Sequence, residues 1–230
     1  MISAFLPCRR GSERVPDKNI KKFSKYNFGL TEIKLLQLVK TDLIDRIYLS
    51  TDDEKIINFA SNLKSKKIII HKRCSLLCQS TTSTDDLVGH AVDLIKEGVI
   101  LWTHVTSPFL TCRLYDEIIK RYHMEKNLGF DSLMTVTEIQ SFIWDDSGPI
   151  NYDRTEEKWP RTQTIKPIYE INSGVFLADC EIYKKNKDRI GDCPYLYKLD
   201  RLDGFDIDWP EDFVIAQQMC AQGLSSVGLD

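Results

Sequence analysis

The sequence predicts an α/β fold of three layers, with a mostly parallel sheet between two layers of helices. Strand-like and helix-like patterns alternate four times before residue 130, which is typical of a chain that returns repeatedly to one sheet. The chain has 230 residues, of which 42% are hydrophobic and 28% charged. This composition can bury a core without disulfides and excludes a disordered protein. We therefore expect a single domain over residues 1–230.

The first half of the chain contains four short apolar strands, each followed by a helix that is apolar on one side. Strands of this kind are buried on both faces, so we expect helices to cover both sides of the sheet. The inward face of the first helix is expected to consist of Leu30, Ile33, Leu36 and Val39. The expected strands are Ile2–Pro7, Arg46–Ser50, Lys67–His71 and Val99–Val105, and the expected helices are Leu30–Lys40, Glu54–Leu63, Asp85–Lys96 and Leu114–Lys126.

The pattern changes after about residue 130, where a polar, aromatic and irregular insert of about 135–170 interrupts the alternation. Such an insert usually covers a site or forms an interface. The expected strands of this half are Asp131–Ile139, Phe142–Trp144 and Ser173–Ala178, and the expected helices are Glu181–Asn186 and Glu211–Ala221.

One tetrapeptide occurs twice, as Ser50–Asp53 and as Ser83–Asp86. A serine or threonine before a helix can cap its free N–H groups, and aspartate in the first turn suits its positive end. Two well-capped helices are the simpler interpretation. The alternative is that at least one of these segments lines a site beyond the end of a strand.

Charge and cysteine content narrow the class of protein. The formal net charge is only -3, which argues against a nucleic-acid binder. No apolar run is long enough to span a membrane, and the first residues lack the charged start of a signal peptide. The seven cysteines are irregularly spaced, which favours reduced thiols over disulfides or zinc. We expect a cytoplasmic protein.

The first strand leads into a basic loop, Arg9–Lys25, with seven basic and two acidic residues. Phosphates bind at this edge of parallel sheets. Gly11 allows close approach of the backbone, and Ser12 can donate hydrogen bonds to phosphate oxygens. The spacing of the glycines matches neither a Walker loop nor a dinucleotide fingerprint. A phosphate site is thus favoured over a merely solvated basic loop.

Five segments in order carry a resemblance to a known family. Together they resemble the acylneuraminate cytidylyltransferases, or CMP-sialic acid synthetases, along almost the whole chain. The resemblance implies a Rossmann-like nucleotidyltransferase fold, with the insert serving dimerisation and sugar binding. The segments are Leu6–Asn19, Tyr48–Glu54, Thr106–Pro108, Arg161–Gln163 with Asn172–Gly174, and Asp206–Phe213.

The resemblance implies a Mg²⁺-dependent enzyme and a homodimer. Such an enzyme transfers CMP from CTP to the anomeric hydroxyl of a 2-keto-3-deoxy acid sugar, sialic acid or a related nonulosonate, by direct displacement of pyrophosphate. Surface polysaccharide assembly is the pathway that it suggests. The alternatives are a different acceptor, 3-deoxy-manno-octulosonate or a phosphonate, and a catalytically silent nucleotide-binding relative. No nucleic-acid or membrane partner is expected.

The resemblance also implies roles for individual residues. Asp206 and Asp208 are expected on one strand, where alternate side chains share a face, and would bind the metal. A merely acidic surface is the alternative. The implied CTP-binding residues are Arg9, Gly11, Ser12, Arg14, Lys18, Asn19, Arg73, Thr82 and Thr84. The implied sugar-binding residues are His104, Thr106, Ser107, Arg161, Gln163, Tyr169 and Asn172. The implied catalytic residues are Arg9, Lys18, Asp206 and Asp208.

Two positions depart from the family pattern. Glu13 stands where the family loop has lysine, and the neighbouring Arg14 is the candidate to supply that charge. His104 stands where sialic acid synthetases commonly have a sugar-contacting glutamine. His104 therefore puts N-acetylneuraminate itself in question as the acceptor, unless this histidine has a purely structural role at the strand end.

Overall fold

A seven-stranded sheet in the order β3-β2-β1-β4-β8-β5-β9 forms the centre of the computed structural model, which describes residues 1–229. Asp230, the last residue of the expected domain, lies outside the described residues. Only β8 runs antiparallel to its neighbours, so the expected mostly parallel sheet is confirmed. The strands are β1 (Ile2–Pro7), β2 (Arg46–Thr51), β3 (Ile68–Lys72), β4 (Val99–Thr103), β5 (Ser132–Ile139), β8 (Ile168–Asp179) and β9 (Pro194–Leu199).

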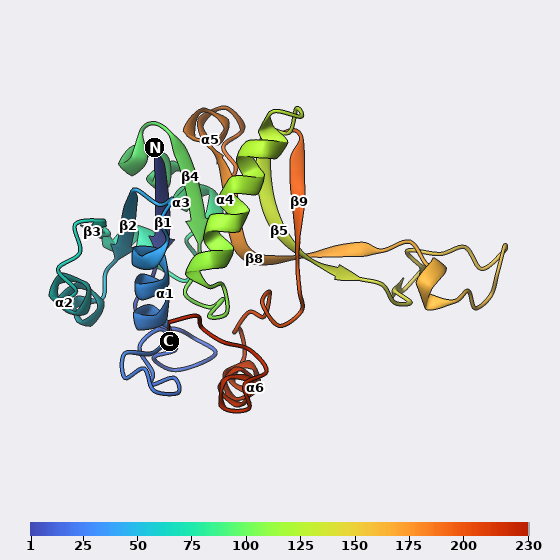
Figure 1. Cartoon of the computed structure of the whole chain (residues 1–230), viewed down its shortest axis with the longest axis horizontal. Helices are drawn as coiled ribbons and strands as arrows, with labels where there is room; N and C mark the ends of the chain where they lie inside the picture. The colour runs from blue at the N-terminus through green and yellow to red at the C-terminus, as the bar shows by residue number, and fades with distance from the viewer. Residues whose placement is uncertain (230) are drawn as a thin grey trace.

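Helices cover both faces of this sheet, as the apolar strands predict (Figure 1). Two separate clusters of buried side chains, one on each face, make up the core. The larger cluster packs α1, α2, α4 and α6 against the sheet, and the smaller one packs α3 and α5. The helices are α1 (Gly29–Lys40), α2 (Glu54–Asn62), α3 (Thr84–Ile95), α4 (Cys112–Lys126), α5 (Cys180–Asn186) and α6 (Pro210–Ala221).

The repeated tetrapeptide caps helices in both places. The Asp53 carboxylate accepts a hydrogen bond from the Lys55 N–H at the start of α2. Ser83 and Asp86 exchange reciprocal bonds, Asp86 N to Ser83 Oγ at 3.0 Å and Ser83 N to Asp86 Oδ2 at 3.3 Å, which form a capping box. These contacts satisfy N–H groups that a helix start leaves without partners.

Several expectations about individual elements are wrong. The buried face of α1 contains Thr31, Lys34 and Gln37, whereas Leu36 and Val39 are only half-buried. β8 is twice as long as expected, and β9 was not expected at all. Asp206 and Asp208 do not lie on a strand, because residues 205–208 form an irregular segment between β9 and α6. The sequence period could not reveal this, since the segment is held by contacts with other loops.

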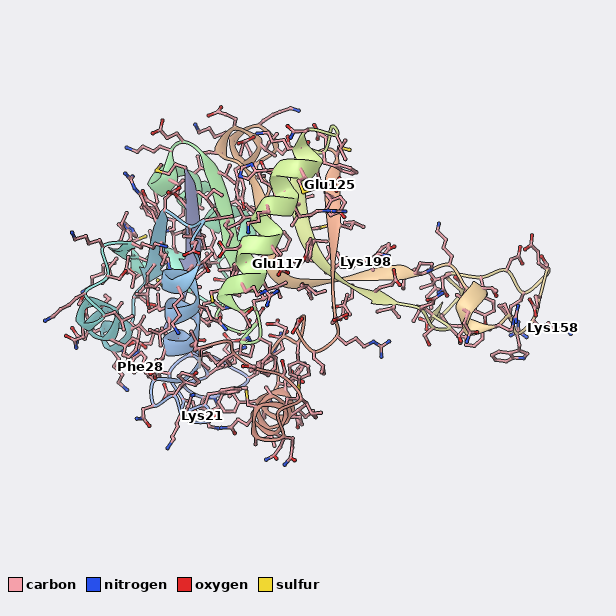
Figure 2. All side chains as sticks on the ribbon, in the orientation of Figure 1. Lys21, Phe28, Glu117, Glu125, Lys158 and Lys198 are labelled. Atoms are coloured by element: carbon pink, nitrogen blue, oxygen red, sulfur yellow. The ribbon has the colours of Figure 1, made fainter. Side chains whose placement is uncertain are left out.

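The insert forms an arm, residues 140–167, that projects from the outer ends of β5 and β8 (Figure 1). The arm carries β6 (Trp144–Asp145) and β7 (Gly148–Pro149), a two-stranded pairing where only the strand Phe142–Trp144 was expected. Figure 2 shows Lys158 at the far end of the arm and Lys198 near its base. Aromatic rings pack together on the arm, yet Trp144 and Trp159 remain 48% and 65% exposed.

The loops that follow β1, β2 and β4 lie at the same end of the sheet as α6 (Figure 1). This is the edge at which parallel sheets bind ligands. No helix among residues 1–229 is long and apolar enough to cross a membrane.

Candidate active site

The loop after β1 is anchored through its backbone, which leaves its basic side chains available. The Arg10 N–H donates to Asp52 Oδ1 at 2.7 Å, and Asn19 Nδ2 donates to the Arg9 carbonyl at 3.0 Å. Gly11 adopts a φ of +75°, a conformation that glycine reaches without strain. The segment therefore curls over the end of the sheet at a fixed place.

A cavity of about 300 Å³, which we call the loop cavity, opens beside this loop. Cationic side chains of the loop line one part of it, and the residues after β4 line another. The lining residues are Pro7, Cys8, Arg9, Ser12, Glu13, Arg14, Lys18, Asn19, His104, Val105, Thr106 and Asp208.

The segment Asp206–Asp208 is bound to both of these loops. The Ile207 N–H donates to the Thr106 carbonyl at 3.0 Å, and Lys18 Nζ donates to the Ile207 carbonyl at 2.6 Å. Ile207 is fully buried, while Asp208 is exposed. The Asp208 carboxylate lies 3.2 Å from Arg14 and 3.7 Å from Lys18. Segments nearly 200 residues apart in the sequence thus meet at one carboxylate.

Burial and charge perturb the ionisable groups here. Burial first, and then the neighbouring Asp208 charge, raise the pKa of Asp206. Burial also lowers the pKa of Lys18, while the two carboxylates oppose that change. Perturbed groups beside a cavity are typical of functional sites. A cation bound between the carboxylates would relieve their mutual repulsion.

Two buried side chains of α1 hold the loop after β4 in place. Lys34 Nζ donates to the Ser107 carbonyl and to the Tyr115 hydroxyl, both at 2.8 Å, and Gln37 Nε2 donates to the Pro108 carbonyl at 2.7 Å. Both side chains are fully buried. Our sequence reasoning missed them, although a lysine and a glutamine inside an apolar helical run were the available signal.

A second cavity, of about 730 Å³, lies between the base of the arm and the same acidic segment. We call it the arm-base cavity. Asp208 lines both cavities, so the two adjoin at this residue. Arg201 is a cation of this cavity that sequence reasoning missed. The lining residues are Thr137, Ile139, Ser141, Ile143, Glu170, Ile171, Asn172, Ser173, Arg201, Gly204, Phe205, Asp206, Asp208 and Trp209.

Most residues expected at the nucleotide phosphates do line the loop cavity, but those expected at the nucleoside do not. Arg73 is buried and donates from Nη2 to the Ser50 carbonyl at 3.0 Å. Thr82 Oγ1 donates to the Leu76 carbonyl at 3.1 Å, and Thr84 is the first residue of α3. Gly11 belongs to the loop without lining the cavity.

The residues expected to bind sugar are divided between four places. His104 and Thr106 line the loop cavity, and Asn172 lines the arm-base cavity. Ser107 is buried, with its Oγ 3.4 Å from Asp206 Oδ1. The fourth group also lines neither cavity of this chain and lies on the arm or at the beginning of β8: Arg161, Gln163 and Tyr169.

The departure at Glu13 has a structural counterpart. Its carboxylate lies 3.7 Å from Arg9, so the acid pairs with a cation of its own loop. Arg14 lines the loop cavity and stacks over the Trp209 ring at 4.6 Å. The Arg14 side chain therefore lines the cavity next to the acidic segment.

The chain is similar in sequence to known cytidylyltransferases. An N-acylneuraminate cytidylyltransferase of Streptococcus agalactiae is 22% identical over 223 residues, which cover 91% of this chain and 51% of that protein. A pseudaminic acid cytidylyltransferase of Campylobacter jejuni is 27% identical over 138 residues, 59% of this chain and 58% of that protein. The chain spans about half the length of the curated relatives it matches.

Two solved structures have the same fold. The CMP:2-keto-3-deoxy-manno-octonic acid synthetase complexed with CTP has a TM-score of 0.64 at 13% identity, over 96% of this chain and 99% of that one. The 4-diphosphocytidyl-2C-methyl-D-erythritol synthase of Anaerococcus prevotii has a TM-score of 0.66 at 18% identity, over 96% of each chain. The expected nucleotidyltransferase fold is confirmed, while identities this low carry no more than the fold.

A cytidylyltransferase family model matches residues 4–220. The match includes the basic loop, the loop after β4, the arm and the acidic segment. The chain belongs to the cytidylyltransferase family.

Proposed function

We propose that this protein transfers CMP from CTP to the anomeric hydroxyl of a 2-keto-3-deoxy acid sugar and releases pyrophosphate. One observation carries the proposal: Arg14 and Lys18 converge on Asp208, at the point where the two cavities adjoin. This arrangement suits a nucleotide on one side and an acceptor on the other. The names of the sialic and pseudaminic acid relatives support an acidic sugar as that acceptor.

The loop cavity would hold the triphosphate of CTP. Arg9, Arg14 and Lys18 carry positive charge to its wall, and Ser12 offers a hydroxyl donor. Negative charge grows on pyrophosphate as it leaves, so fixed cations beside it stabilise the transition state more than the ground state. Because the cations are held by the fold, little reorganisation is needed at that moment.

Asp206 and Asp208 fit a bound Mg²⁺. Magnesium prefers oxygen ligands and takes few of them from the protein, keeping water and phosphate oxygens for the rest. Burial and the Asp208 charge raise the pKa of Asp206, and a bound cation would offset both effects, while Arg14 and Lys18 are the cations that already face Asp208. When bound, the ion would make a nearby hydroxyl more acidic and neutralise phosphate charge.

The arm-base cavity would hold most of the acceptor, and the reacting end of the acceptor would pass Asp208 into the loop cavity, where His104 and Thr106 lie. Its volume of about 730 Å³ suits a sugar of eight or nine carbons. Arg201, on the wall of this cavity, is a cation for the acceptor carboxylate within the same chain. Arg161 lies on the arm, so it would serve the site only through a neighbouring subunit.

A homodimer would bring that arm to a second copy of the chain. The arm exposes apolar side chains, with Ile150 at 55% and Trp159 at 65%. Exposed apolar residues gathered on one projection favour a protein interface. In a dimer built this way, the arm of one protomer would lie against the cavity of its partner.

The decisive experiment is a panel assay. The protein is incubated with CTP and Mg²⁺ and with N-acetylneuraminate, pseudaminate, 3-deoxy-manno-octulosonate or a phosphonate, and pyrophosphate is followed. Release with one of the nonulosonates is expected. Turnover only with the octulosonate or the phosphonate would reassign the acceptor, and no release with any sugar would leave a silent nucleotide-binding relative.

A further inference from the structure

His104 lies directly after β4, and the two side chains that contact its ring do not line the loop cavity. Trp102 Nε1 donates to His104 Nε2 at 2.9 Å. Arg189 Nη1 lies 3.5 Å from the same nitrogen. His104 lines the loop cavity together with Thr106, whereas Trp102 and Arg189 do not.

These contacts determine the protonation of the imidazole. An indole N–H and a guanidinium can only donate hydrogen bonds, so Nε2 of His104 must present its lone pair. The ring is then neutral and carries its proton on Nδ1. No hydrogen bond joins that N–H to another described residue. Nδ1 also does not belong to the fully enclosed polar atoms that lack a partner, so it is open to its surroundings. The Nδ1–H thus keeps access to a ligand.

The two positioning side chains are themselves fixed. Trp102 is 1% exposed and packs against Phe5, with ring centroids 4.7 Å apart. The Arg189 guanidinium lies 4.0 Å from the ring centre of Phe176 and 5.1 Å from that of Trp102. Among residues 1–229, no carboxylate pairs with Arg189.

The charges around the ring all favour the neutral form. Arg189 faces His104 from the segment after α5, Lys34 from α1, and Lys18 from the loop after β1. Burial, followed by these three cations, lowers the pKa of His104 to about 3. The electrostatics therefore agree with the tautomer that the hydrogen-bond geometry requires.

We propose that Trp102 and Arg189 are positioning residues that lock His104 as a neutral Nδ1–H donor to an oxygen of the bound acceptor sugar. The assignment of the ligand rests on the proposed function, whereas the tautomer does not. With its lone pair engaged by Trp102, His104 does not remove the proton from the acceptor hydroxyl. It supplies one directional hydrogen bond that is the same at pH 6 and at pH 8.

The tautomer is read directly by ¹⁵N NMR of histidine-labelled full-length protein without substrate. The signal of His104 is identified among the four histidines by its loss in His104→Gln. The expected result is an Nδ1–H ring that does not titrate between pH 5 and pH 8. An Nε2–H ring, or titration near pH 6.5, would overturn the lock.

Trp102→Phe removes the N–H and keeps the ring, and Arg189→Met removes the charge. We expect either change to produce a mixture of tautomers or a histidine that titrates within that range. Trp144→Phe, the same substitution on the arm, is the matched control and should leave His104 unchanged. If neither Trp102→Phe nor Arg189→Met altered the ring, these two residues would not be its positioning groups.

Kinetics test the donor role separately. Trp102→Phe should raise the KM for the acceptor about threefold to tenfold, the effect of one weakened hydrogen bond, with a smaller change in kcat. In the His104→Gln background, a neutral amide donates without help from Trp102, so the same substitution should have little further effect. An unchanged KM in a variant whose tautomer has changed would refute donation to the acceptor. Absence of turnover with every sugar would instead contradict the proposed function.

Discussion

Asp208 is the residue at which the two halves of the site meet. Its carboxylate is within 4 Å of Arg14 and Lys18, and it borders both cavities. Substitution with asparagine keeps the shape and removes the charge. The effect of this substitution on CTP binding can therefore be compared with its effect on turnover.

If Asp208 holds Mg²⁺ as proposed, Asp208→Asn should abolish turnover and leave CTP affinity within about tenfold, because the loss of a metal ligand acts mainly in the transition state. Pyrophosphate release and calorimetric titration with CTP measure the two effects. Asp200→Asn, an exposed carboxylate that lines neither cavity, is the control and should retain activity. Full turnover in Asp208→Asn would remove this residue from the site.

Lys34 is the second residue with an unusual environment, since its amine is fully buried and bonded to neutral oxygens, and burial lowers its pKa well below the ordinary value. Lys34→Met should lower the free energy of unfolding by about 1–3 kcal/mol, because the Ser107 carbonyl would lose a buried donor. Urea denaturation measures the change. Lys40→Met, on the exposed side of the same helix, should stay within about 0.5 kcal/mol. Equal effects of the two substitutions would mean that the Ser107 contact adds nothing.

At the scale of elements, the arm begins beyond a register shift in the pairing of β5 with β8. The pairing of β5 with β8 shifts register between Met134 and Val136, and beyond the shift both strands continue out of the body of the molecule. A ribbon of this length has no core of its own, so its stability depends on what it touches. A second subunit is the partner that we propose.

Ile150→Asp should therefore weaken the dimer, since a charge would be placed on an apolar contact surface. Light scattering coupled to gel filtration measures the mass across a range of protein concentrations. Ile215→Asp is the matched control, because Ile215 is similarly exposed, at 48%, but lies on α6. A wild-type protein that is monomeric at every concentration would exclude the dimer.

At the scale of the whole molecule, near-neutrality conceals two opposed charge clusters. The half of the chain up to residue 115 carries a net charge of +6, and the remainder carries -9. Folding brings the basic loop and the acidic segment together at one end of the sheet. The net charge alone therefore said little about the electrostatics of the site.

Histidine burial makes stability depend on pH. The pKa of His104 is about 3 in the folded protein, below its ordinary value of 6.5, so the unfolded chain takes up the proton first. Its contribution to stability is complete above about pH 6.5 and is lost as the pH falls toward 3. Between pH 7 and pH 5 the free energy of unfolding should fall less steeply with pH for His104→Gln than for the wild type, by up to about 1.4 kcal/mol per pH unit. Denaturation curves at several pH values measure it. The exposed His123→Gln is the control, and identical slopes in the two variants would contradict this burial.

The sequence by itself determined the layers, most helix and strand positions and the presence of a basic loop after β1. These features depend on local periods, on caps such as Ser83 with Asp86, and on the place of a loop after a strand. The acidic pair Asp206 and Asp208 is also visible in the sequence, but the segment that carries it is irregular and not a strand. Ile207 is buried between the two carboxylates because its N–H donates to the Thr106 carbonyl and its carbonyl accepts from Lys18 Nζ.

Only the tertiary structure decided the remaining features. No local pattern places Lys34 under the loop after β4, gives Asp208 its two cations, or sets Trp102 against His104, since each contact joins parts that the topology brings together. The same holds for Arg161, which the family resemblance placed at the sugar site but which lies on the arm and lines neither cavity of its own chain. The type of each residue is known from the sequence, but the burial of its side chain and its contacts depend on long-range packing.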